Sequence, residues 1–156
     1  MKIYIAGSFK SQSRLRPIRD KFWKTGHEVI GSWLDEGAMP EGVTPAMYDK
    51  QLATKDLAEL KAADCIILDL IDPSTTGGRM VEWGYALGHA KLRYTVGENP
   101  CIFLALADIA FKTWDDLFCH FNDAHARCGY TITSINNGKY TRTIIPEMPW
   151  NALYKK

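Results

Sequence analysis

The sequence predicts an α/β protein with a doubly wound, parallel sheet of five strands and helices on both faces. Three observations predict this fold class. Short β-rich runs alternate along the chain with longer helical segments. The run Cys65–Ile71 is almost continuously apolar, as expected for a central parallel strand that helices cover on both faces. Loops rich in glycine and hydroxyl residues follow two of the expected strands, where such sheets bind ligands.

The first half of the chain is expected to hold two strands and two helices. Gly26 closes the first helix, whereas Thr44 and Pro45 supply an N-cap and a first-turn proline to the second. The expected elements are the strand Lys2–Ala6, the helix Arg14–Thr25, the strand His27–Ile30, the loop Glu36–Val43 and a helix from Pro45 to about Ala63.

The second half continues the alternation with three strands and two helices. The expected elements are the strand Cys65–Ile71, a helix from about Gly78 to Lys91, the strands Arg93–Gly97 and Ile102–Leu106, and the helix Trp114–His125. This order predicts a flavodoxin- or Rossmann-like arrangement. Ligands bind there outside the carboxyl ends of the strands, so we expect the site near Gly7-Ser8 and Asp72-Pro73.

The C-terminal part of the chain predicts a β-hairpin. The runs Tyr130–Ile135 and Tyr140–Ile145 are rich in β-branched residues and flank Asn136-Asn137-Gly138, a strong turn signal. Residues 129–156 are therefore expected as a hairpin and tail extension of one domain that spans 1–156. The pattern leaves open whether the hairpin is an edge ribbon or an arm across an oligomer interface.

Composition excludes several classes of protein. The formal net charge of +1 gives no field that recruits a nucleic-acid polymer or an anionic membrane. The longest apolar run, Cys101–Ala107, is too short to span a bilayer, and the N-terminus is unlike a signal peptide. The cysteines form no close pair of the kind that zinc and redox motifs need. We therefore expect a reduced, cytoplasmic protein without metal or cofactor; its cysteines are Cys65, Cys101, Cys119 and Cys128.

Glu82 is the first candidate for chemistry. It lies about one turn into a helix that follows a glycine- and hydroxyl-rich loop, where backbone can approach a ligand closely. The alternative is that Glu82 pairs with Arg79, three residues earlier, on a solvated face. The loop and helix start supply candidate substrate-binding residues, namely Asp72, Ser74, Thr76 and Gly78.

Asp56 is a second unusual carboxylate, because it shares a helical stripe with apolar residues. A carboxylate on such a stripe is costly unless it is paired or functional. The alternative is a partly exposed residue at the edge of the stripe. The apolar neighbours are Leu52, Ala53, Leu60 and Ala63.

The turn after the first strand is a weaker candidate. Gly7 and Ser8, followed by Lys10, Arg14 and Arg16, have the backbone N–H groups and cations that could cradle a phosphate. A solvated helix face is the alternative for the basic residues. Two aromatic residues could stack on a base or pack in the core, namely Phe9 and Trp33.

Several of these segments together resemble the nucleoside 2-deoxyribosyltransferase family. The resemblance covers about residues 1–115, and its most specific part is the Glu-x-Gly-x-Ala pattern after a glycine loop. The matching segments are KIYIAGSF at the start, the helix with Asp56-Leu57, the strand ADCIILDL and the loop and helix GGRMVEWGYALG.

The resemblance implies roles for four residues. Glu82 would attack C1′, displace the base and form a covalent deoxyribosyl intermediate, which a second base or water attacks with net retention. Tyr4 would orient this nucleophile through its hydroxyl, and Asp56 would position it and deliver a proton toward the leaving base. Phe9 would cover the base.

The sequence also departs from the family pattern. Many transferases carry an aspartate six residues before the nucleophile, where this chain has Thr76. They also use an asparagine from a neighbouring subunit, which has no clear match near Asn99–Phe103. Relatives that hydrolyse 2′-deoxynucleoside 5′-monophosphates have a small hydroxyl residue at the position of Thr76 and a Gly-Ser turn with a nearby arginine, as in Gly7-Ser8 and Arg14.

We therefore expect a base-exchanging nucleoside 2-deoxyribosyltransferase. A 5′-monophosphate N-hydrolase and a non-catalytic nucleotide-binding domain are the alternatives. The expected partners are small molecules, a nucleoside or nucleotide and a free nucleobase. The resemblance further implies a homo-oligomer, because sites in that family are completed across subunits.

Overall fold

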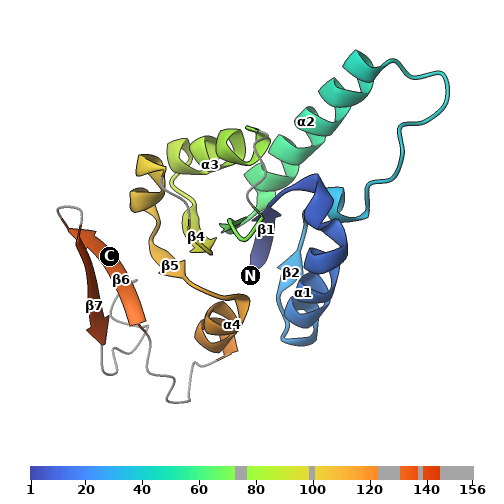
Figure 1. Ribbon diagram of the computed structural model, residues 1–156. Coiled ribbons are helices and arrows are strands. Elements are labelled where there is room, and N and C mark those ends of the chain that lie inside the picture. Colours follow the sequence, from blue (N-terminus) through green and yellow to red (C-terminus); the bar gives the residue numbers. More distant parts are fainter. Residues whose placement is uncertain (73–76, 99–100, 123–130, 137–138, 145–156) are drawn as a thin grey trace.

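Five parallel strands form the sheet of the computed structural model, in the order β2-β1-β3-β4-β5 (Figure 1). The structure describes residues 1–72, 77–98, 101–122, 131–136 and 139–144. This order has its topological switch between β1 and β3, as in flavodoxin-like sheets, so the predicted fold class is confirmed. The strands are β1 (Lys2–Ala6), β2 (Glu28–Val29), β3 (Cys65–Asp69), β4 (Leu92–Val96) and β5 (Ile109–Phe111).

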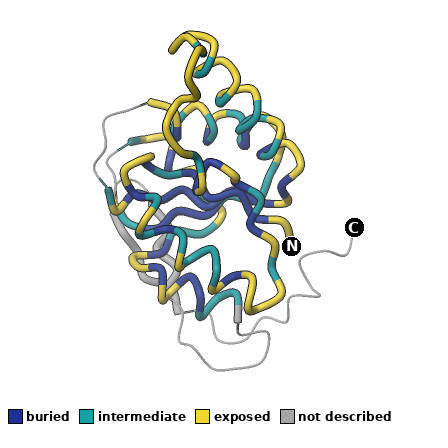
Figure 2. The backbone as a smooth tube through the Cα atoms, turned by 90° about the vertical axis from the view of Figure 1, so that its right-hand side faces the viewer, coloured by how far each residue is buried: buried dark blue, intermediate teal, exposed yellow. Residues whose placement is uncertain are grey.

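Helices cover both faces of this sheet (Figure 1). On one face α1 packs against α4 through the rings of Phe22 and Phe118, whose centroids lie 4.7 Å apart. On the other face α2 contacts α3. The buried strands lie between these two layers (Figure 2). The helices are α1 (Gln12–Lys24), α2 (Pro45–Ala62), α3 (Gly78–Gly88) and α4 (Trp114–Asn122), and short 3-10 helices are η1 (Phe9–Ser11), η2 (Ser32–Asp35) and η3 (Ile102–Leu106).

Local signals explain where the helices begin and end. The Thr44 hydroxyl accepts a hydrogen bond from the Met47 backbone N–H at 3.4 Å, so the predicted N-cap of α2 is confirmed. Gly26, just beyond α1, has a φ of +82°, a conformation that favours glycine. α3 ends at Gly88 instead of the predicted Lys91, because Ala90 adopts a left-handed conformation with a φ of +50°.

The predicted fifth strand is wrong. Ile102–Leu106 forms the 3-10 helix η3, and the fifth strand is β5, which pairs with β4 in the register Tyr94↔Ile109. Ile102 is 78% exposed, whereas Leu104 packs into the core. A strand at this position would bury alternate residues against the sheet, but η3 presents most of its apolar side chains to solvent.

Two further strands lie in the C-terminal part of the chain, where the sequence predicts a hairpin. β6 (Thr131–Asn136) pairs antiparallel with β7 (Lys139–Ile144), with Asn136 opposite Lys139. The predicted turn residues Asn137 and Gly138 lie outside the described residues. Whether the hairpin serves as an edge ribbon or as an interface arm stays a prediction.

None of the helices in the described part of the chain is long and apolar enough to cross a membrane.

Candidate active site

Three of the predicted site residues converge on one face of the sheet, at strand β1. Tyr4 lies in the middle of β1, Glu82 one turn into α3, and Asp56 in α2. Tyr4 is completely buried, and its register partner on β3 is Ile66. The sheet therefore fixes the tyrosine, and two helices on the same face bring the carboxyl groups toward it.

Tyr4 and Glu82 form a direct hydrogen bond. The Tyr4 hydroxyl donates to Glu82 Oε1 at 2.6 Å, a short distance typical of a bond to a carboxylate. Burial and the nearby Glu82 and Asp56 charges raise the pKa of Tyr4 well above its usual value, so the hydroxyl stays protonated and remains a donor. The bond holds one oxygen of Glu82 in place.

Glu82 is largely withdrawn from solvent. Burial raises the pKa of Glu82 to about 7, and the charge of Asp56 adds to the rise, whereas the hydrogen bond from Tyr4 opposes it. The alternative of a solvated Glu82–Arg79 pair is wrong. Arg79 is itself buried, and its guanidinium donates to the backbone carbonyls of Asp69 and Asp72.

Asp56 is half-buried and has an unpaired oxygen. Asp56 Oδ1 is buried and makes no hydrogen bond. Burial is the main cause that raises the pKa of Asp56 to about 6; Lys55 lowers it, and Glu59 and Glu36 raise it. A carboxyl group with such a pKa can hold a proton near neutral pH and give it up, as a general acid must.

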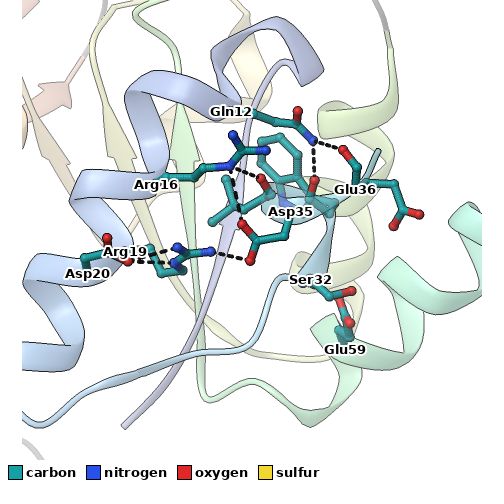
Figure 3. Close-up of polar contacts among 10 residues, drawn as sticks. Gln12, Arg16, Arg19, Asp20, Ser32, Asp35, Glu36 and Glu59 are labelled. Atoms are coloured by element: carbon teal, nitrogen blue, oxygen red, sulfur yellow. Dashed lines mark hydrogen bonds and ion pairs between the residues drawn. The ribbon is translucent and has the colours of Figure 1, made fainter. Parts of the chain in front are cut away.

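Charged residues around Asp56 are tied into a network. Lys55 forms an ion pair with Glu36, which also accepts a hydrogen bond from the Tyr48 hydroxyl at 3.2 Å. Gln12 Nε2 donates to the backbone carbonyls of Trp33 and Glu36 at 2.6 and 3.1 Å (Figure 3). The segment after β2 is thereby bound to α1 on one side and to α2 on the other.

The Gly7-Ser8 turn is built by packing and capping. A Cβ atom on Gly7 would lie 2.9 Å from Leu15 Cδ1, so a side chain at this position would require the buried Leu15 to shift. The buried Ser8 Oγ accepts a hydrogen bond from the Lys10 backbone N–H at 3.3 Å and caps η1. Phe9 is 53% exposed, which leaves its ring accessible at the carboxyl end of β1.

Two of the basic residues after this turn, Arg14 and Arg16, are engaged within the protein. Arg14 forms a bidentate ion pair with the buried carboxylate of Asp69, at 3.2 and 2.5 Å. Arg16 Nε donates to the Leu34 carbonyl at 2.7 Å (Figure 3). Of the two interpretations of Arg16, a residue on a helix face therefore fits its contacts better than a phosphate ligand does.

The remaining predicted residues precede α3 in the sequence or begin it. Asp72 Oδ2 accepts a hydrogen bond from the Ser11 hydroxyl at 2.9 Å, and Gly78 is the exposed first residue of α3. Ser74 and Thr76 lie outside the described residues. Trp33 is only 7% exposed and donates from Nε1 to the Ile5 carbonyl, so the core interpretation is correct for this ring.

Sequence reasoning missed the buried polar residue at the end of β3. The Asp69 carboxylate is completely buried and also accepts a hydrogen bond from Trp114 Nε1 at 3.1 Å. Asp69 sits within the apolar run Cys65–Ile71, and a charged residue inside such a run was the available signal, because it needs a buried partner.

Solved enzymes have a similar fold. One is the 2-deoxyribosyltransferase of the psychrotolerant bacterium Bacillus psychrosaccharolyticus, with a TM-score of 0.63 and 19% identity over 75% of this chain and 90% of that one. Another is the CMP N-glycosidase of Clostridium botulinum, with a TM-score of 0.52 and 15% identity over 78% of this chain and 98% of that one. No family model and no curated protein matches the sequence. The fold that the resemblance implied is therefore confirmed.

Proposed function

We propose that this chain is an enzyme that cleaves the N-glycosidic bond of 2′-deoxynucleosides and transfers the deoxyribose to another base. The observation that carries the proposal is the 2.6 Å hydrogen bond from the buried Tyr4 to Glu82, beside the half-buried carboxyl group of Asp56. The similar fold of a 2-deoxyribosyltransferase and of a CMP N-glycosidase supports this chemistry.

In the first step Glu82 acts as the nucleophile. The oxygen that Tyr4 does not hold attacks C1′ of the sugar, and the C1′–N bond breaks with its electron pair going to the base. Asp56, which has a pKa of about 6, gives its proton to the departing base. The products of this step are the free base and a deoxyribosyl ester of Glu82.

In the second step a nitrogen of the incoming base attacks C1′ of the ester. The bond between C1′ and the Glu82 oxygen breaks, and the carboxylate leaves with its electron pair. The Asp56 carboxylate takes the proton of the incoming base and is ready for another cycle. Two displacements at the same carbon give net retention, as in retaining glycosidases.

The contacts of Arg14 favour a nucleoside over a 5′-monophosphate as substrate. Of the cations near the Gly7-Ser8 turn, Arg14 is neutralised by the buried Asp69, which leaves the exposed Lys10, and the Ser8 hydroxyl already caps η1. A phosphate there would compete with an ion pair that already compensates a buried charge. We therefore place the nucleotide N-hydrolase second.

A chromatographic assay tests the proposal. The protein is incubated with a deoxynucleoside and a free acceptor base, and in parallel with the 5′-monophosphate. We expect the exchanged nucleoside from the first mixture, and its loss by several orders of magnitude in Glu82→Ala and Glu82→Gln. Free base released only from the monophosphate, without exchange, would assign the hydrolase instead. Binding without turnover of either compound would assign a non-catalytic domain.

A further inference from the structure

Arg79 is a buried cation that the proposed reaction does not use. It lies in the first turn of α3 and is only 5% exposed. Its Nη1 donates to the backbone carbonyl of Asp69 at 3.0 Å and to that of Asp72 at 2.8 Å. A guanidinium is costly to bury, and the planar arrangement of its N–H groups lets it hold several acceptors in fixed directions.

Both carbonyls belong to the segment where β3 ends. Asp69 is the last residue of β3, and Asp72 is the last described residue before the loop that leads to α3. Arg79 therefore joins the first turn of α3 to the end of the strand that precedes it. Glu82 follows Arg79 by three residues on the same helix, about one turn away.

The end of β3 is also joined to the turn after β1. Arg14, from α1, holds the Asp69 carboxylate, and the Ser11 hydroxyl donates to the Asp72 carboxylate. Each aspartate thus offers its side chain to the β1–α1 segment and its backbone carbonyl to Arg79. These contacts connect the two segments that flank the carboxyl ends of β1 and β3.

We propose that Arg79 is a positioning residue that sets the distance between Glu82 and Tyr4. Tyr4 is fixed in the sheet, where it pairs with Ile66 of β3, whereas Glu82 is carried by α3. The relative position of α3 and β3 therefore decides whether the Glu82 oxygen meets the Tyr4 hydroxyl. Arg79 acts through Glu82 without touching substrate. This inference rests on the proposed role of Glu82.

The variant Arg79→Lys tests the inference. Lysine keeps the charge, but its Nζ lies one bond short of the position of Nη1, the atom that donates to both carbonyls, so it cannot hold them in the same geometry. We expect kcat to fall roughly 10- to 100-fold, as for an ångström-scale displacement of a reacting group, with KM changed less than about threefold. The matched control is Arg93→Lys, at an arginine that pairs with Asp108 beside β5 and lies in no part of the site.

Hydrogen exchange supplies a readout that needs no activity. We expect faster amide exchange in peptides spanning 70–82 of Arg79→Lys, with exchange in β1 and β4 unchanged. Unchanged exchange in 70–82, or a kcat within twofold of the unmodified protein, would overturn the inference. A rise in KM alone would overturn it too, because it would indicate substrate contact. If the unmodified protein does not transfer deoxyribose between bases, the proposed function fails. The hydrogen-exchange measurement then still decides whether Arg79 holds the end of β3 against α3.

Discussion

At the scale of single residues, burial and the hydrogen bond from Tyr4 shift the pKa of Glu82 in opposite directions. Burial raises the pKa of Glu82 to about 7, whereas the Tyr4 hydroxyl stabilises the ionised form and lowers it. A nucleophile must be ionised to attack, so the tyrosine keeps a buried carboxylate reactive near neutral pH.

Tyr4→Phe is predicted to make Glu82 a weaker acid. Without the hydroxyl the pKa of Glu82 rises above about 7, so a smaller fraction of Glu82 is ionised at neutral pH and the pH–rate profile moves to higher pH. A hydrogen bond to a charged group contributes about 1.5–3 kcal/mol, so kcat should fall roughly 10- to 100-fold at neutral pH. Steady-state kinetics across pH measures both effects. The control is Tyr85→Phe, which alters a tyrosine of α3 that stacks on His89. If the pH–rate profile of Tyr4→Phe superimposes on that of this control, the proposed role of Tyr4 is contradicted.

Asp56→Asn is predicted to change both limbs of the same profile. The rate requires Glu82 ionised and Asp56 protonated. Because the pKa of Glu82 (about 7) lies above that of Asp56 (about 6), only a minor fraction of the protein has this form, and activity should rise up to about pH 6 and fall above about pH 7. Asparagine cannot give a proton to the base, so the descending limb should disappear and the maximal rate should fall about 100-fold or more. The rate of the variant should follow the ionisation of Glu82 alone and reach a plateau, with a midpoint somewhat below pH 7 because the Asp56 charge that raises the pKa of Glu82 is gone.

The control for this prediction is Asp49→Asn, at an exposed position of the same helix. Its pH–rate profile should match that of the unmodified protein. A descending limb that persists in Asp56→Asn would show that another group supplies the proton.

At the scale of elements, the β1–α1 turn depends on the absence of a side chain at Gly7. A Cβ there would meet Leu15 and Trp33 at 2.9 and 3.3 Å. Gly7→Ala should therefore lower the free energy of unfolding by about 1–3 kcal/mol and reduce activity, because the turn borders the site. Gly37→Ala is the control, since nothing lies within 4 Å of its added Cβ. Urea unfolding of the two variants makes the comparison, and equal stabilities would refute the packing argument.

The elements also show where sequence reasoning succeeds and where it stops. β1 and the N-cap of α2 were predicted correctly, because periodicity and capping are local properties. β5 was placed wrongly, since the apolar run Ile102–Leu106 satisfies a strand pattern but η3 leaves most of it in solvent. Local pattern alone does not decide which apolar run pairs with the sheet.

The residues of the candidate site were likewise predicted only in part. Glu82, Asp56 and Tyr4 were predicted from a motif and a resemblance, and the structure brings them together. The connections through Asp69 and Arg79 were missed, because they join residues 55 and 10 positions apart and two of the acceptors are backbone carbonyls. No sequence pattern encodes such contacts.

At the scale of the whole molecule, two buried carboxyl groups make stability depend on pH. The folded-state pKa values of about 7 for Glu82 and about 6 for Asp56 lie above the ordinary values of 4.5 and 3.8. A group whose pKa is raised by folding contributes stability below its unfolded pKa, and that contribution is lost as pH rises through the folded value. The contribution of these two groups to the free energy of unfolding should therefore fall between about pH 3.8 and 7.

Glu82→Gln is predicted to remove much of this dependence. Relative to the unmodified protein, the variant should gain on the order of 2 kcal/mol of stability when the pH is raised from 5 to 8. Urea unfolding at the two pH values measures the difference, with Glu41→Gln, at an exposed loop position, as the control. The same stability difference at both pH values would show that Glu82 is not buried in its ionised form.

The central claim, that Glu82 bonds to the sugar, is tested most directly by mass spectrometry of the protein quenched during turnover of a deoxynucleoside. The account predicts a mass increase of one deoxyribosyl group, located by proteolysis on the peptide that contains Glu82 and absent from Glu82→Ala. An adduct on a peptide without residue 82, or turnover by Glu82→Ala at the rate of the unmodified protein, would contradict it.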